Sequence, residues 1–187
     1  MSTWWHRKPH SEAGRSDGRL TLTAAHSTPE VVVRELDDVD AALVADLTAA
    51  DILVHGSLTV PAGEDQSRAL LTEWAARRCA DTGNLLGICS AGQTRLESVI
   101  AVHLSSDFVA EIATITRAEE QSRRAAIDGI VLFRRYARDR MGLVRIWGEA
   151  DHIDTQTLRM FREAGFTVED LLGSNSLDGQ VRYSSIA

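Results

Sequence analysis

The sequence predicts an α/β protein of the α+β kind, in which helices flank one mixed, mostly antiparallel central sheet. Three observations predict it. Apolar runs of strand length recur in the middle of the chain, separated only by short loops containing Gly, Ser and Asp. Two helical stretches with apolar residues on one face come before these runs, and two more alternate with the later strands. The predicted order is β-α-α-β-β-β-α-β-α-β-β, without an internal repeat or a second domain.

Composition is that of a protein with one substantial core. The chain has 187 residues, of which 44% are apolar and 25% are charged, which suffices for a single domain. The formal net charge of −7 argues against a general nucleic-acid binder. No apolar run approaches a membrane span, and the N-terminus lacks the apolar core of a signal peptide. Because Cys79 and Cys89 cannot form a disulfide framework, we expect a cytoplasmic protein with reduced thiols.

Residues 1–28 are rich in Ser, Gly, Arg and His and show no sustained period, which predicts a flexible arm ahead of a single domain at 29–187. The first half of that domain is expected to contain a strand at 31–36, a helix opening at Asp37–Asp38, an irregular stretch at 51–63 and a helix at 65–80. The second half is expected to contain strands at 84–89, 96–104 and 108–116, a helix to about 140, a strand at 143–150, a helix from 154 to Gly165, and strands at 166–171 and 181–186.

The turn after the third of these central strands lacks what such a turn usually contains. A strand that feeds a helix N-terminus presents free backbone N–H groups and the positive end of the helix dipole, which suits an anion. Glycine normally lets the backbone approach a phosphate closely. Residues 118–125 instead read Ala-Glu-Glu-Gln-Ser-Arg-Arg-Ala, with no glycine and two carboxylates. What this turn binds therefore decides the activity.

The element order and two local strings resemble the GCN5-related N-acetyltransferase superfamily, and in particular its ribosomal-protein-type N-acetyltransferases. The strings are Gly142-Leu-Val-Arg-Ile146 and the stretch from Met160 through Gly165-Phe166 to Glu169. The resemblance covers roughly residues 30–186. It implies a sheet with two splayed strands between which acetyl-CoA enters.

This resemblance also implies where the cofactor lies. The pantetheine arm would follow the strand at 111–116, including Ile112 and Thr114, and the pyrophosphate would sit in the turn beginning at Ala118. Two glycines of that turn correspond to Gln121 and Arg123. Arg123 and Arg124 would then contact the phosphates directly. The positions of a pantetheine-binding Asn, a nearby Ser and a thiolate-protonating Tyr are taken by Asp154, Thr157 and Phe161.

Glu111 matches a family position where a glutamate deprotonates the amine. Burial on one face of a strand would raise its pKa toward the range of a general base. The alternative is a carboxylate on the wet face or one paired with an arginine, and alternation does not decide between the two. His55 and His103 are candidate substrate-binding residues, with an exposed loop histidine and a structural histidine as the alternatives.

The stretch Asp151-His152-Ile153-Asp154 resembles a small acid–histidine cluster, but its spacing matches no strong zinc pattern, so no metal is expected. The favoured interpretation is a loop in which Asp154 caps the next helix.

Three functions follow from these residues. The first is an acetyl-CoA-dependent N-acetyltransferase acting on a primary amine of a small molecule or a peptide N-terminus, with Glu111 as base and Thr157 or water protonating the leaving thiolate. The second is the same fold used without coenzyme A for acid–base chemistry on a small molecule. The third is a non-catalytic binding module. Neither nucleic acid nor membrane is expected as a partner, and a homodimer is left open.

Overall fold

The computed structural model describes residues 13–14, 20–24, 31–92, 94–151, 154–169 and 180–186. These residues form one sheet in the order β1-β2-β3-β5-β6-β7-β8-β10-β9, with β4 paired to β7 beside this path. The strands are β1 (Ala13–Gly14), β2 (Thr21–Ala24), β3 (Val31–Glu35), β4 (Ile52–His55), β5 (Gly83–Ser90), β6 (Ser98–Ser106), β7 (Val109–Arg117), β8 (Arg145–Asp151), β9 (Thr167–Val168) and β10 (Gln180–Ile186). The helices are α1 (Ala41–Thr48), α2 (Glu64–Cys79), α3 (Glu120–Tyr136) and α4 (Thr155–Glu163).

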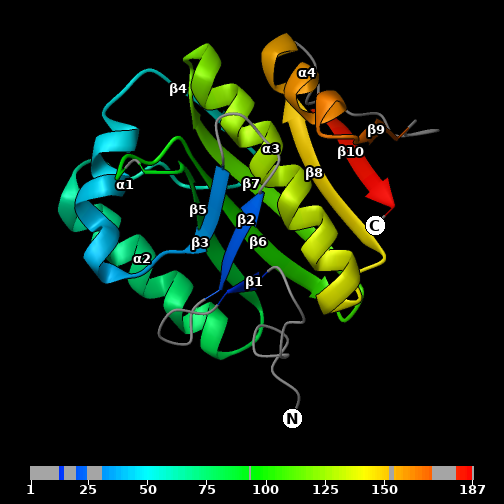
Figure 1. Cartoon of the computed structure of the whole chain (residues 1–187), viewed down its shortest axis with the longest axis horizontal. Helices are drawn as coiled ribbons and strands as arrows, with labels where there is room; N and C mark the ends of the chain where they lie inside the picture. Colours follow the sequence, from blue (N-terminus) through cyan, green and yellow to red (C-terminus); the bar gives the residue numbers. More distant parts are fainter. Residues whose placement is uncertain are drawn as a thin grey trace.

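Helices cover both faces of the sheet (Figure 1). On one face, Phe133 of α3 and Phe161 of α4 pack with Ile112 of β7 in a single buried cluster. On the other face, α1 and α2 pack against Ile115 of β7 in a second cluster. Because successive strand residues point to opposite faces, even-numbered β7 residues face α3 and α4, and odd-numbered ones face α1 and α2.

The mixed, mostly antiparallel sheet and the flanking helices confirm the predicted fold class. Among the described strands only β7 and β8 pair in parallel, as a crossover through α3 requires. A 3-10 turn at Asp38–Asp40 precedes α1, capped by Asp37 in a capping box with Asp40. After α3 the chain continues as a short π-helix, Ala137–Met141. This helix ends at Gly142, as expected.

Two parts of the chain differ from the sequence prediction. Within the predicted arm, residues 13–14 and 21–24 are strands, and β2 pairs along β3. The rest of 1–28 lies outside the described residues. In the stretch expected to be irregular, Ile52–His55 forms β4, which pairs antiparallel with Thr114–Arg117 of β7. All three strands are short, and pairing with a neighbouring strand rather than a local period stabilises them.

The sheet divides in the middle, and β4 lies at the division. β7 pairs with β8 only through Val109–Glu111 and Arg145–Trp147. Farther along, β8 stays paired with β10, while the same edge of β7 is paired with β4. Two splayed strands were expected, but the edge between them is covered by a segment of this chain.

Gly56, which follows β4, allows a close contact that no other residue would allow. It has a φ of 73°, and a Cβ built there would lie 2.7 Å from the Cβ of Ala113. We expect Gly56→Ala to lower the free energy of unfolding by about 1–3 kcal/mol, through backbone strain and overpacking, measured by urea denaturation. Gly63→Ala is the control, because Gly63 has a φ of 83° but open space around it. Equal losses in both variants would contradict the packing argument.

Among the residues that the structure describes, no helix combines the length and the apolar character needed to cross a membrane.

Candidate functional site

The gap between β7 and β8 is filled by His55. This residue lies opposite Thr114 in the β4–β7 ladder and is only 2% exposed. Its ring packs on Phe161 of α4 with 4.2 Å between the ring centroids. A Cβ at Gly148 of β8 would lie 3.1 Å from its Nε2 and 2.9 Å from the carbonyl oxygen of Ile112. Glycine at 148 therefore lets β8 approach both neighbours.

Several polar atoms in this gap have no hydrogen-bond partner among the described residues. Neither ring nitrogen of His55 has a hydrogen bond among the described residues, and neither does Oγ1 of the buried Thr114. Burial lowers the pKa of His55 from 6.5 to about 4, against the opposing charge of Asp154. An imidazole buried without partners stays neutral and carries a desolvation penalty. Within the described part of the chain it is held by packing, on Phe161 and against Gly148.

The first turn of α4 borders this gap. The Asp154 carboxylate accepts a hydrogen bond from the backbone N–H of Thr157 at 3.0 Å, which confirms Asp154 as the helix cap. Thr157 is fully buried, and its hydroxyl donates to the other Asp154 oxygen. His152 and Ile153 lie outside the described residues. Thr114, Asp154 and Phe161, which the resemblance assigned to one site, thus lie beside His55, and Thr157 joins them through Asp154.

Ion pairs hold the turn before α3 within the chain. Glu120 contacts both Arg123 and Arg124, and these pairs hold the pKa of Glu120 below its ordinary value. Arg123 also donates to Oε1 of Gln156 at 2.9 Å. The two arginines expected to bind phosphate are therefore paired with residues of this chain. The hollow beside them, between α3 and α4, is lined by side chains of both charges, Glu120, Arg123, Arg124, Gln156, Arg159 and Glu163.

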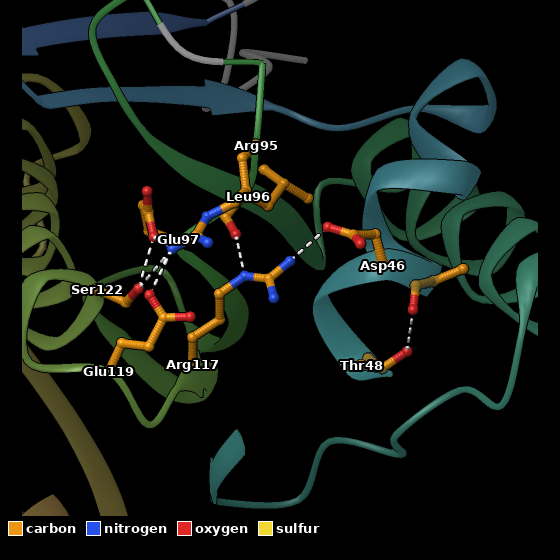
Figure 2. A network of polar contacts seen from close by, with 9 residues as sticks. Asp46, Thr48, Arg95, Leu96, Glu97, Arg117, Glu119 and Ser122 are labelled. Atoms are coloured by element: carbon orange, nitrogen blue, oxygen red, sulfur yellow. Dashed lines mark hydrogen bonds and ion pairs between the residues drawn. The ribbon is translucent and has the colours of Figure 1, made fainter. Parts of the chain in front are cut away.

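A buried acidic network continues behind this turn (Figure 2). Glu97 is fully buried, and its Oε2 accepts from Oγ of Ser122 at 2.6 Å and from Arg95 at 3.1 Å. Arg95 also contacts Glu119 at 2.8 Å. Three carboxylates, those of Glu97, Glu119 and Glu120, therefore lie around the start of α3. These carboxylates interact with the positive end of the α3 helix dipole, which would otherwise attract a phosphate.

Arg117, the last residue of β7, is fixed on the opposite side of the same network. Its Nε donates to the carbonyl oxygen of Leu96 at 3.0 Å, and its Nη2 contacts the Asp46 carboxylate of α1 at 2.5 Å (Figure 2). Its side chain is almost completely buried. A buried guanidinium with fixed partners ties β7 and α1 to the segment just before β6, so it stabilises the turn rather than serving as a free anion ligand.

Glu111 lies on the other face of the sheet. It is half-buried and pairs across the ladders with His103 of β6 and Trp147 of β8. Burial raises the pKa of Glu111 above its ordinary value and the Glu149 carboxylate adds to the rise, whereas His103 and Arg182 oppose it. Among the described residues, Glu111 makes neither a hydrogen bond nor an ion pair. Of the two readings left open for Glu111, the structure favours a partly desolvated, unpaired carboxylate.

The surroundings of Glu111 were not anticipated from the sequence. Arg182 of β10 contacts Glu149 at 2.7 Å and lies over the ring of Trp147, 4.6 Å from its centroid. Strand alternation, which places Trp147 and Glu149 on one face of β8, is the signal that could have indicated them. Nothing in the sequence of β10 indicated that Arg182 would pair with Glu149.

As described, these residues do not fit acetyl-CoA in the expected place. The edge of β7 from Thr114 to Arg117 is occupied by β4. The turn that would hold the pyrophosphate contains no glycine, and carboxylates surround it. An extended arm cannot bond to backbone groups that already pair with another strand.

No family model matches the chain. A curated protein, 4-hydroxy-tetrahydrodipicolinate reductase from Halorhodospira halophila, is 28% identical over 134 residues, which cover 60% of this chain and 50% of that protein. The chain thus spans about half the length of this curated relative.

Solved structures resemble this chain over most of its length. Ribosomal-protein-S5-alanine acetyltransferase from Vibrio fischeri superposes with a TM-score of 0.68 at 10% identity, covering 88% of this chain and 96% of that one. Ribosomal L7/L12 α-N-protein acetyltransferase in complex with coenzyme A gives 0.69 at 13%, covering 88% and 97%. Spermidine N-acetyltransferase from Vibrio cholerae gives 0.64 at 15%, covering 86% and 95%. At these identities the likeness concerns the fold, and the chain has the fold of the GCN5-related N-acetyltransferases.

Proposed function

We propose that this protein transfers an acetyl group to a primary amine of a small molecule or a peptide N-terminus, and that Glu111 removes the amine proton. The observation that carries the proposal is Glu111 itself. It stands where β7 and β8 separate, half-buried and unpaired among the described residues, with a raised pKa. A carboxylate with a raised pKa accepts a proton more readily than an ordinary glutamate does.

The face around Glu111 suits a cationic acceptor. Glu149 adds a second carboxylate and Trp147 adds an aromatic surface; Arg182 already contacts both, so an ammonium group would share or displace this arginine. The net charge of −7 acts in the same direction at longer range. In this arrangement Glu111 takes the proton of the bound ammonium group and leaves a neutral amine. The ring of Trp147 packs on its carbon chain, and Glu149 binds any further cationic group of the acceptor.

Acetyl-CoA is the proposed donor, because solved neighbours of this fold include an acetyltransferase in complex with coenzyme A. In this chain it needs an edge of β7 that β4 now covers, so binding is the first quantity to measure. Calorimetry with acetyl-CoA, followed by mass spectrometry of a panel of primary amines, tests the proposal. Acetylation of an amine supports it. The absence of both binding and acetylation at millimolar acetyl-CoA, with every form of the protein, would reject it.

A second candidate is the same fold used without coenzyme A, as an acid–base enzyme or a binding module. The covered β7 edge and the paired arginines favour it. Turnover of an amine-containing metabolite without acetyl-CoA, lost in Glu111→Gln, would establish the enzymatic form. A reductase activity is not proposed, because the sequence contains no Gly-x-Gly-x-x-Gly string for a dinucleotide.

Charge at the first turn of α3 should limit binding of the donor. We expect Glu120→Gln to tighten acetyl-CoA binding roughly three- to ten-fold at low salt, because it removes a negative charge from the helix start and releases Arg123 and Arg124. Titration calorimetry measures the change. Glu73→Gln, which breaks a similar pair with Arg77 on α2, should leave the affinity unchanged. Unchanged affinity in Glu120→Gln would show that these arginines do not reach the phosphates.

A further inference from the structure

The edge of β7 that the proposed cofactor requires is occupied by four residues of the same chain. Ile52 lies opposite Arg117, beside the turn before α3, and His55 lies opposite Thr114, at the division of the sheet. β4 therefore runs from the expected phosphate end of the groove to its inner end. This is the path expected for an extended arm bearing amide groups.

We propose that β4 is a built-in, reversible occupant of this groove, and that β4 and the pantetheine arm of acetyl-CoA compete for the same edge of β7. The proposal rests on the proposed function. It explains why the fold of acetyltransferases appears here without an accessible cofactor edge. It also assigns β4 a role as an autoinhibitory strand.

Contacts of β4 set the free-energy cost of its release. The strand has four residues and pairs along one edge only in the described structure. Val54 is 39% exposed, but Ile52 and Leu53 are mostly covered and Ile52 packs on the second cluster, so release of the strand exposes two aliphatic side chains and costs free energy that the incoming arm must supply. His55 is the one buried residue of β4, and it is buried without hydrogen bonds among the described residues. Its release would let both ring nitrogens reach water, which offsets part of the lost packing.

The connections to β4 allow it to move. Residues 56–63 link β4 to α2 without a regular element, and both Gly56 and Gly63 lie in this link. Leu58 of this link is buried in the same cluster as Leu71 and Trp74, so β4 would swing at Gly56 and Ser57 while Leu58 and α2 stay packed. Release would also expose Oγ1 of Thr114 and free the backbone groups of Thr114–Arg117. These groups would then pair with the amides of an incoming arm.

Two engineered forms test the competition. Val54→Pro removes a strand former from β4 and should loosen it. Val60→Pro is its matched control, because Val60 is 37% exposed and lies outside the sheet. The opposite change uses Val54 and Ile115, which face each other across the ladder. The double variant V54C/I115C, made in a C79S background, should form a disulfide that locks β4 in place when oxidised. Reduction of this disulfide releases β4.

Acetyl-CoA affinity of each form is measured by calorimetry, with hydrogen exchange of the β4 amides in its presence and absence. We expect Val54→Pro to bind roughly ten-fold more tightly than the wild type, and Val60→Pro to bind like the wild type. The oxidised double variant should not bind, its reduced form should, and acetyl-CoA should accelerate exchange in β4 of the wild type.

The outcomes separate the two proposals. Equal affinity in the oxidised, reduced and wild-type forms would overturn the competition and leave acetyl transfer standing. No binding by any form, including Val54→Pro and the reduced pair, would overturn both. Binding that appears only when β4 is loosened would support both and show that β4 is tightly held in the resting protein.

Discussion

Glu111→Gln is expected to reduce kcat/KM for amine acetylation by about 10²–10⁴-fold, because glutamine keeps the shape of the side chain but cannot accept the amine proton. The effect should fall mainly on kcat, since the acceptor still contacts Trp147 and Glu149. Initial rates over a range of amine concentrations, with acetyl-CoA saturating, measure it. Thermal unfolding of both proteins should coincide, because Glu111 is only half-buried and makes no ion pair within the described residues.

The pH dependence of kcat/KM distinguishes a catalytic base at Glu111 from a merely structural carboxylate. In the wild type, kcat/KM should fall on the acid side as Glu111 becomes protonated, at a pH above the ordinary glutamate range. Glu149→Gln removes the neighbouring charge that helps to raise the pKa of Glu111, so this acid limb should move to lower pH. Glu169→Gln, which breaks a pair with Arg145, should leave the limb in place. A Glu111→Gln variant within three-fold of the wild type would rule out Glu111 as the base.

Most of the fold was predictable, because its main elements carry local signals. The stripe through Ile130 and Phe133 marks α3, and both residues are fully buried. Asp154 caps α4, as its position before the helix indicated. β4 was missed because a run of only three apolar residues, Ile52 to Val54, has no period of its own. Its pairing partner is some 60 residues away, and such a long-range contact leaves no local pattern.

The candidate site was predicted as one set of residues, and the structure divides it in two. Thr114 and Glu111 are three residues apart on β7, and strand alternation places them on opposite faces. His103 lies with Glu111 on the face toward α1 and α2. His55 lies with Thr114, Asp154 and Thr157 on the face toward α3 and α4. No sequence pattern indicated that His55 belongs to a strand, so its position in the gap could not be foreseen.

Burial of His55 as a neutral imidazole makes the stability of the fold depend on pH. Its pKa is about 4 in the folded protein and about 6.5 in the unfolded chain. Above pH 6.5 the imidazole is neutral in both the folded and the unfolded state, so protonation of His55 does not lower the free energy of unfolding. As the pH falls from 6.5 toward 4, the unfolded chain binds a proton that the folded protein excludes. The free energy of unfolding should therefore drop by about 3 kcal/mol across this window.

A substitution isolates this contribution from the carboxylates that titrate in the same range. Urea unfolding of the wild type and of His55→Gln, followed by tryptophan fluorescence at pH 7 and pH 4.5, should show a larger loss in the wild type by about 2–3 kcal/mol. His103→Gln, on the opposite face, should lose as much as the wild type. His55→Gln is expected to be less stable than the wild type at pH 7, because the contact with Phe161 is altered, but the difference should narrow with acid. If wild type and His55→Gln lose stability in parallel, the imidazole is accessible to protons in the folded state, and β4 is already released for a substantial fraction of the time.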